Sequence, residues 1–197
     1  TFRSQPNENT YVPAIAMFLE PAADGRTQLT DEAVLYEHAA MRIRGSTSAT
    51  FPKKQYKLEI HDVLGDDRDV SIFGLPTESD WVLYGPYSDK TLMRNFLSYN
   101  WSAAMGQYAP RTVFCEVFVN QNNVRVDTDD YVGLYVLVEQ ITIDENRVDI
   151  QEISGGTPEN PTVTGGAILK VDRYDTDEYY FTGASGTRMV VHNPKID

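Results

Sequence analysis

Two segments in the first third of the sequence alternate strictly between apolar and polar residues. In residues 40–44 two apolar side chains alternate with two arginines, and in residues 55–60 three apolar side chains alternate with Lys57 and Glu59. Successive side chains of a strand point to opposite faces of a sheet, so this period of two predicts half-buried strands. The chain must therefore build a sheet with one face toward a core, and Lys57 and Glu59 share the opposite face.

The rest of the chain adds more strands and one helix. Apolar residues recur at spacings of three and four over about 90–105, after Ser88 or Asp89 as a cap and before Gly106 as a stop, which predicts the helix. Further strands are predicted at 11–19, 81–84, 113–119, 131–139, 166–172 and 188–192. The fold class is therefore α+β, with a mostly antiparallel β-sheet and one principal helix.

The length and ends of the chain suggest how it is organised. Residues 1–10 are polar and are interpreted as a leader, whereas residues 11–197 are predicted to form a single domain. The chain does not begin with Met and ends soon after a predicted strand. We therefore expect it to be a segment of a longer protein.

The composition excludes several classes of protein. Lys and Arg number 17 and Asp and Glu 29, which gives a net charge of −12 and argues against a nucleic-acid binder. No apolar stretch approaches the length of a membrane-spanning helix. Cys115 is the single cysteine, so no intramolecular disulfide can form, and its place within a strand predicts a packed thiol.

Several well-known site motifs are missing from the sequence. It contains no Gly-x-Gly-x-x-Gly, no Walker-type loop and no Gly-x-Ser-x-Gly. The three histidines lack metal-ligand spacing, and the acidic stretches 127–130 and 172–178 do not match the calcium-loop template. No metal ligand is therefore assigned from the sequence.

A basic segment stands out in this acidic chain. No Asp or Glu occurs between Glu37 and Glu59, yet Arg42, Arg44, Lys53, Lys54 and Lys57 lie there together with a turn rich in Gly, Ser and Thr. Backbone amides of such a turn, flanked by Arg and Lys, suit an anionic ligand such as a polyphosphate. The alternative is a pair of exposed strands whose lysines prevent edge pairing.

Three other positions are candidates with a structural alternative. Capping of the helix explains Asp89. It does not explain Arg94-Asn95, which is either a surface pair or a group that supports the residues in contact with a ligand. Glu139 ends an apolar run and either lies at the rim of a sheet or partners a buried base. Lys170 faces opposite to Leu169 and Val171, either in solvent or in a cleft.

Taken in order, seven stretches resemble the family of CotH kinases, named for a spore coat protein. Their order and spacing fit the family from about residue 10 to the end of the chain. They are Arg44-Gly-Ser-Thr-Ser48, Phe51-Pro-Lys-Lys-Gln-Tyr-Lys-Leu-Glu59, 74–95 from Gly-Leu-Pro to Met-Arg-Asn, Tyr108-Ala-Pro-Arg111, Gly133-Leu-Tyr-Val-Leu-Val-Glu139, Asn146-Arg-Val-Asp149 and Gly165-Gly-Ala-Ile-Leu-Lys-Val-Asp172.

The resemblance implies an atypical protein kinase fold that binds ATP with Mg²⁺ or Mn²⁺ and phosphorylates protein hydroxyls, and this chain would resemble its N-lobe. It implies that Lys54 or Lys57 pairs with phosphate, and the residues alone do not decide between them. Glu139 would be the acidic partner. The candidate cofactor contacts are Arg44, Gly45, Ser46, Thr47, Ser48, Arg94, Asn95 and Lys170.

The chain departs from the family where the chemistry is completed. The family continues into a helical lobe with catalytic and metal-binding aspartates, including a Trp-Asp-x-Asp type motif, whereas Trp81 and Trp101 are followed by Val and Ser. Since phosphoryl transfer needs a bridging metal ion and an oriented nucleophile, we expect this stretch to be inactive alone.

A non-catalytic extracellular module that binds a glycan or a protein is the alternative. Its support is the strand-rich pattern, the acidic loops and the 12 tyrosines, whereas the basic segment favours the nucleotide. The resemblance suggests an extracellular, cell-surface or spore-coat location. It also suggests membership of a larger assembly such as a cellulosome.

Overall fold

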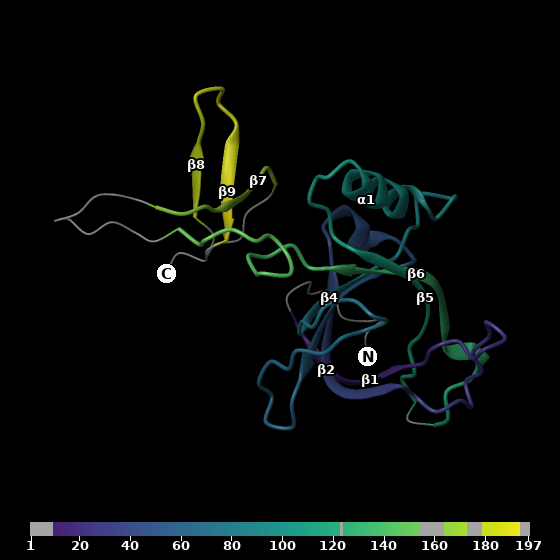
Figure 1. Cartoon of the computed structure of the whole chain (residues 1–197). Helices are drawn as coiled ribbons and strands as arrows, with labels where there is room; N and C mark the ends of the chain where they lie inside the picture. Colours follow the sequence, from purple (N-terminus) through teal and green to yellow (C-terminus); the bar gives the residue numbers. More distant parts are fainter. Residues whose placement is uncertain (1–9, 123, 154–163, 173–178, 194–197) are drawn as a thin grey trace. The chain divides into compact units, whose positions relative to one another are not determined.

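The computed structural model describes residues 10–122, 124–153, 164–172 and 179–193 (Figure 1). Contacts between residues divide the chain into two compact units, Thr1–Gln140 and Ile141–Asp197, and each is described here by itself. Residues 1–9 of the predicted leader lie outside the described residues. The single domain over 11–197 remains a prediction.

The first unit is built on a six-stranded antiparallel sheet that curls into a half-barrel (Figure 1). The strand order is β1-β2-β3-β4-β6-β5. The strands are β1 Val12–Phe18, β2 Leu35–Arg44, β3 Gln55–His61, β4 Asp80–Tyr84, β5 Thr112–Phe118 and β6 Tyr131–Glu139. Both alternating segments are strands, as predicted, and they pair with each other.

One face of this sheet, which we call the core face, carries the main hydrophobic core. Side chains of residues paired across an antiparallel ladder point to the same face of the sheet. The pairing of β2 with β3 therefore brings the apolar residues of the two alternating segments to one face. Leu58 faces Trp81 across β3 and β4, and both are buried. The connection between β3 and β4 adds Val70, Ile72 and Leu75 to the same cluster.

The opposite face, which we call the outer face, is covered in part by α1, Arg94–Ala104. Phe96 of the helix packs against Phe114 of β5 with ring centroids 4.7 Å apart, and Tyr99 packs against the small cluster of Val82, Val136 and Val138. The helix therefore covers β4, β5 and β6 and leaves the outer face of β2 and β3 to polar side chains.

The helix begins later than the predicted start near residue 90. Asp89 accepts hydrogen bonds from the backbone amides of Thr91 and Arg94, but Leu92 has a positive φ of 62°. A left-handed residue cannot belong to a right-handed helix, so the capping carboxylate holds a turn before α1 starts.

The second unit contains a three-stranded antiparallel sheet in the order β7-β9-β8. Its strands are β7 Ile168–Lys170, β8 Tyr180–Thr182 and β9 Arg188–Asn193. β8 was not predicted, and β7 is shorter than the predicted strand 166–172. The described part of the chain contains α1 as its single α-helix, so the predicted class of a mostly antiparallel sheet with one helix is confirmed.

Candidate functional site

The hydroxyl-rich turn between β2 and β3 is a compact, well-anchored loop. Residues Thr47–Thr50 form a short 3-10 helix, and the Thr50 hydroxyl donates to the Thr47 carbonyl at 2.7 Å. Gly45 has φ +96°, and a Cβ there would lie 2.0 Å from Ser48 Oγ. Glycine is therefore strongly favoured at this position, because any other residue would be strained there and would crowd Ser48.

Lys53 and Lys54 tie this loop to itself and to β6. The Lys54 ammonium donates to the Ala49 carbonyl at 2.7 Å, inside the loop. The Lys53 ammonium donates to the Leu134 carbonyl and lies 4.8 Å from the ring centroid of Tyr135, whose hydroxyl donates to the Lys54 carbonyl. Burial lowers the pKa of Lys53, as expected for an ammonium removed from water. These two lysines therefore shape the loop.

Arg44, Arg42 and Lys57 form a row of cations on the outer face. Arg44 is opposite Gln55 and Arg42 is opposite Lys57 in the pairing of β2 with β3. The row therefore runs away from the loop along two neighbouring strands. The next pair along, Ala40 with Glu59, brings a carboxylate to the same face.

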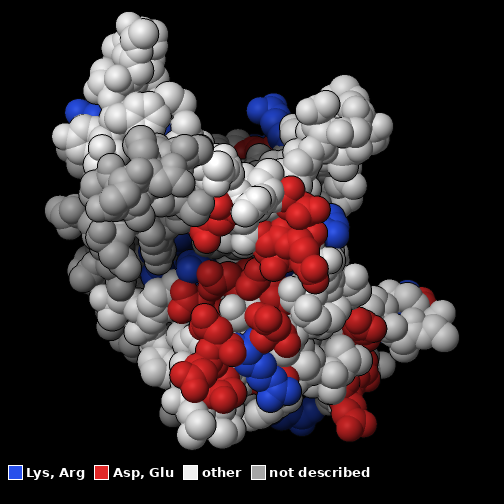
Figure 2. All heavy atoms as spheres, turned by 60° about the vertical axis from the view of Figure 1, so that its left-hand side comes forward, with Lys and Arg blue, Asp and Glu red and all other residues white. Residues whose placement is uncertain are grey.

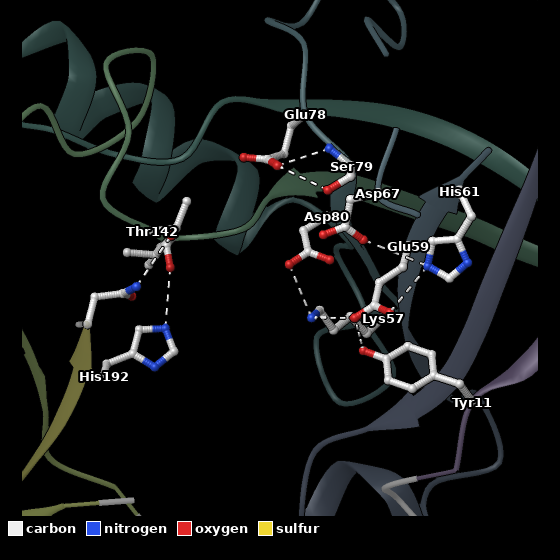
Figure 3. A network of polar contacts seen from close by, with 12 residues as sticks. Tyr11, Lys57, Glu59, His61, Asp67, Glu78, Ser79, Asp80, Thr142 and His192 are labelled. Carbon is white, nitrogen blue, oxygen red and sulfur yellow. Dashed lines mark hydrogen bonds and ion pairs between the residues drawn. The ribbon is translucent and has the colours of Figure 1, made fainter. Parts of the chain in front are cut away.

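Lys57 has its ammonium between two carboxylates (Figure 3). Its Nζ lies 2.8 Å from Glu59 Oε1 on the same strand and 3.2 Å from Asp80 Oδ2 on β4. The side chain of Lys57 is 14% exposed and that of Asp80 32%. His61 lies farther along β3, with Nε2 3.7 Å from Glu59 Oε2. Lys57 is therefore a mostly buried lysine whose ammonium is held by carboxylates from two strands.

The pKa values follow from this arrangement. Burial alone would lower the pKa of Lys57, but Glu59 and Asp80 outweigh it and raise the pKa. Burial would raise the pKa of Glu59, but hydrogen bonds from Lys57 and Tyr11 hold it below the ordinary value. Burial dominates at Asp80 and raises its pKa despite Lys57. Lys57 therefore stays charged at neutral pH and Glu59 ionised.

Glu139 ends β6 with a buried carboxylate. It accepts hydrogen bonds from the Arg111 backbone amide and from the Arg111 guanidinium, each at 2.8 Å. The partner of Glu139 is therefore an arginine whose side chain is 46% exposed, not a buried base. The structure therefore gives Lys57 the acids Glu59 and Asp80 and gives Glu139 the base Arg111.

The other predicted cofactor contacts belong to different elements. Arg94 and Asn95 open α1, and the Arg94 side chain is 77% exposed, with Nε 3.5 Å from the capping Asp89. Lys170 belongs to β7 in the second unit and is half-buried, whereas its neighbours Leu169 and Val171 are 41% and 70% exposed. Exposure therefore alternates along this segment, as predicted, and Lys170 lies on the less exposed face.

The connection from Glu59 to Asp80, the two acids at Lys57, is itself rich in acidic residues. The connection between β3 and β4 has Asp or Glu at positions 62, 66, 67, 69 and 78, and Asp67 Oδ1 lies 4.0 Å from His61. One face of the molecule shows such side chains gathered around fewer basic ones (Figure 2). Within the described ranges, no three His, Cys, Asp or Glu side chains converge as a metal site. No helix there is long and apolar enough to span a membrane.

Tyr11 contacts Glu59 and Asp80 contacts Lys57, although neither residue was predicted from the sequence as part of a site. Tyr11 directly precedes β1, and Asp80 is the first residue of β4. Glu59 could have been found, because an acid two residues after Lys57 in an alternating strand shares its face. The sequence also left Lys54 and Lys57 equivalent, whereas the structure gives them different surroundings.

Comparison with known proteins addresses the identity of the chain. No curated protein matches it. Residues 41–191 match the model of a protein family described as CotH kinase protein, and this segment includes the loop, the cation row, α1 and Glu139. Because the match covers more than half of the 197 residues, the chain belongs to the CotH kinase family.

Proposed function

We propose that this chain is the ATP-binding portion of a CotH-type protein kinase and that Lys57 is its phosphate-pairing lysine. The family suggests a kinase-like function. Our choice of Lys57 rests on the position of its ammonium. Glu59 and Asp80 hold this ammonium on the outer face, and Arg42 is the residue opposite Lys57 on β2.

Protein kinases use a strand lysine held by a carboxylate to pair with nucleotide phosphates. Lys57 has this form, because it lies on an inner strand of the sheet with carboxylates at its ammonium. Lys54 differs, since its ammonium closes a loop on the carbonyl of Ala49. In this proposal Lys57 binds phosphate and Lys54 keeps the loop in shape.

The other candidate residues have supporting roles. Arg42 and Arg44 extend the positive charge along the row, and the 46–48 segment brings backbone amides and hydroxyls to its end. Mg²⁺ or Mn²⁺, when bound with ATP, neutralises phosphate charge and takes its ligands from phosphates and one or two carboxylates. We assign no metal ligand among the described residues.

We further propose that the six-stranded sheet with α1 acts as a kinase N-lobe and that the 197 residues bind ATP without transferring its phosphoryl group. Transfer needs metal-binding and nucleophile-orienting carboxylates, and we expect these in a helical lobe, as the resemblance to the family implies. Protein hydroxyls are the proposed acceptors. Mass spectrometry of the purified chain after incubation with Mg²⁺-ATP tests the proposed inactivity. An increase of about 80 Da, the mass of one phosphoryl group, would overturn it.

Titration calorimetry with ATP and Mg²⁺ or Mn²⁺ tests the proposed site. We expect binding that weakens with added salt and falls at least about tenfold in Lys57→Ala, since a lost charge-assisted contact costs 1.5–3 kcal/mol. Arg26→Ala, on an exposed arginine in the connection between β1 and β2, is the control and should not change affinity. Equal losses in Lys54→Ala and Lys57→Ala, with both variants folded, would contradict the choice of Lys57.

A second candidate function rests on exposed aromatic side chains at the end of α1. Trp101 is 63% exposed and Tyr108 45% exposed, and large exposed aromatic groups often mark a binding surface. A module that binds a glycan or protein partner would use such residues. Absence of ATP binding, together with ligand binding that Trp101→Ala abolishes, would favour this function.

An extracellular or cell-surface location is also a proposal, as is assembly with spore-coat or cellulosome components. Both rest on the family resemblance alone. Immunodetection of the protein in separated cell, surface and medium fractions tests the location.

A further inference from the structure

Tyr11 lies against the cation row, although it precedes the segment that matches the family, which begins at residue 41. The ring centroid of Tyr11 lies 5.2 Å from Arg42 Cζ and 5.9 Å from Lys57 Nζ. Its hydroxyl donates to Glu59 Oε1. One residue from the flank of β1 thus touches two cations and the carboxylate that holds one of them (Figure 3).

The same oxygen atom of Glu59 serves two donors. Glu59 Oε1 accepts from the Tyr11 hydroxyl and also lies 2.8 Å from the Lys57 ammonium. Burial and the bond to Glu59 raise the pKa of Tyr11, so the phenol stays protonated and remains a donor at neutral pH. A hydroxyl donated to a carboxylate satisfies part of its hydrogen-bonding capacity and disperses part of its charge.

We propose that Tyr11 is a positioning residue of the phosphate site, which weakens the hold of Glu59 on Lys57 and so keeps Lys57 available to an anionic ligand. An incoming phosphate meets the repulsion of Glu59 as well as the attraction of Lys57. By occupying Glu59 Oε1, the hydroxyl reduces both the repulsion and the competition for the ammonium. The ring meanwhile restricts water around Arg42 and Lys57. This role rests on the proposed function, because it assumes that Lys57 binds phosphate.

Tyr11→Phe separates the hydroxyl from the ring, since it removes only the donor. We expect ATP affinity to fall about three- to tenfold, less than in Lys57→Ala, because Tyr11 acts on the ligand only through Glu59 and Lys57. Tyr36→Phe is the matched control, because Tyr36 lies on neighbouring β2, is 61% exposed and undergoes the same chemical change. Its ATP affinity should equal that of the wild type.

The rate of acetylation of Lys57 by acetic anhydride gives a readout that does not depend on ATP. Without the hydroxyl, Glu59 pairs with Lys57 alone and less free amine is available, so peptide mass spectrometry should show slower acetylation in Tyr11→Phe than in wild type. A merely structural role for Tyr11 would loosen the site and make acetylation faster. Acetylation at Lys90 provides an internal reference.

The outcomes distinguish this inference from the proposed function. If wild-type protein does not bind ATP, the proposed function fails, and the acetylation rate still decides whether Tyr11 weakens the Glu59–Lys57 pair. If ATP binds but Tyr11→Phe binds it equally or more tightly, the positioning role is overturned. Unchanged or faster acetylation of Lys57 in Tyr11→Phe overturns it as well.

Discussion

Glu139 and Arg111 are joined twice, because the carboxylate accepts from both the backbone amide and the guanidinium of the arginine. The Glu139 side chain is 0% exposed, whereas that of Arg111 is 46% exposed. The buried carboxylate is thus paired with a guanidinium that reaches solvent. This contact also fixes the end of β6 to the residue that precedes β5.

We predict that Arg111→Met destabilises the protein more than Glu139→Gln does. Arg111→Met leaves a buried carboxylate without its guanidinium, at a cost of about 3 kcal/mol, whereas Glu139→Gln removes the charge and keeps acceptor oxygen for the Arg111 amide. Urea unfolding of both variants measures the difference, with Arg26→Met, an exposed arginine, as the control. A larger loss for Glu139→Gln would contradict the dependence of the anion on Arg111.

We predict a pH-dependent effect for Glu59→Gln. The pKa of Glu59 is lowered in the folded protein, so its ionised form adds stability above the unfolded pKa of about 4.5, and this is lost as pH falls through the lower folded value. Near pH 7 the variant should be less stable by about 1 kcal/mol, and the difference should shrink between about pH 5 and 3. Denaturant unfolding at each pH measures it. A difference that stays constant to pH 3 would show that Glu59 does not act through its charge.

The fold could be predicted from the sequence wherever a local pattern fixed it. Strict alternation at 40–44 and 55–60 predicted two paired strands, because a half-buried sheet imposes a period of two. β8 was missed because Tyr180–Thr182 is short and exposed, so no alternation marks it. The start of α1 was placed too early because a capping Asp89 also fits a turn, and only the positive φ of Leu92 reveals that turn.

The candidate site was less accessible to sequence reasoning, because its contacts cross between strands. The basic segment was evident from the charge pattern, but the anchoring of Lys53 to the Leu134 carbonyl depends on tertiary packing. Asp80 reaches Lys57 only through the register of β3 with β4. Tyr11 approaches Lys57 because β1, which follows Tyr11, pairs with the edge of β2 opposite to β3. No local sequence pattern predicts that pairing.

We predict that Cys115 is unreactive in the folded protein. Burial raises the pKa of its thiol to about 11, although a backbone hydrogen bond with Leu137 opposes the shift. The thiolate is the reactive form, so at pH 8 disulfide reagents should modify Cys115 at least about a hundredfold more slowly than in urea-unfolded protein. Following the release of thionitrobenzoate in both states checks this. Equal rates would show that the thiol is exposed.

We predict that Gly85→Ala disturbs the loop at 45–54 even though Gly85 lies far from it in sequence. A Cβ at Gly85 would lie 2.7 Å from the Lys54 carbonyl oxygen and 2.8 Å from the Tyr135 ring. Neither neighbour is the end of a flexible chain, so the backbone must shift and the Tyr135 hydrogen bond to Lys54 is strained. The expected loss of stability is about 1–3 kcal/mol, typical of overpacking.

Hydrogen exchange tells whether that shift reaches the loop. Amides of residues 46–51 should exchange faster in Gly85→Ala, because displacing the Lys54 carbonyl loosens the turn that Lys54 closes on Ala49. Gly183→Ala is the matched control, since its new Cβ would meet its nearest neighbour at an ordinary 3.7 Å. Unchanged exchange at 46–51 in a folded Gly85→Ala variant would mean that the loop keeps its shape without this contact. In that case Lys53 and Lys54 alone would have to hold the segment that we propose brings amides and hydroxyls to phosphate.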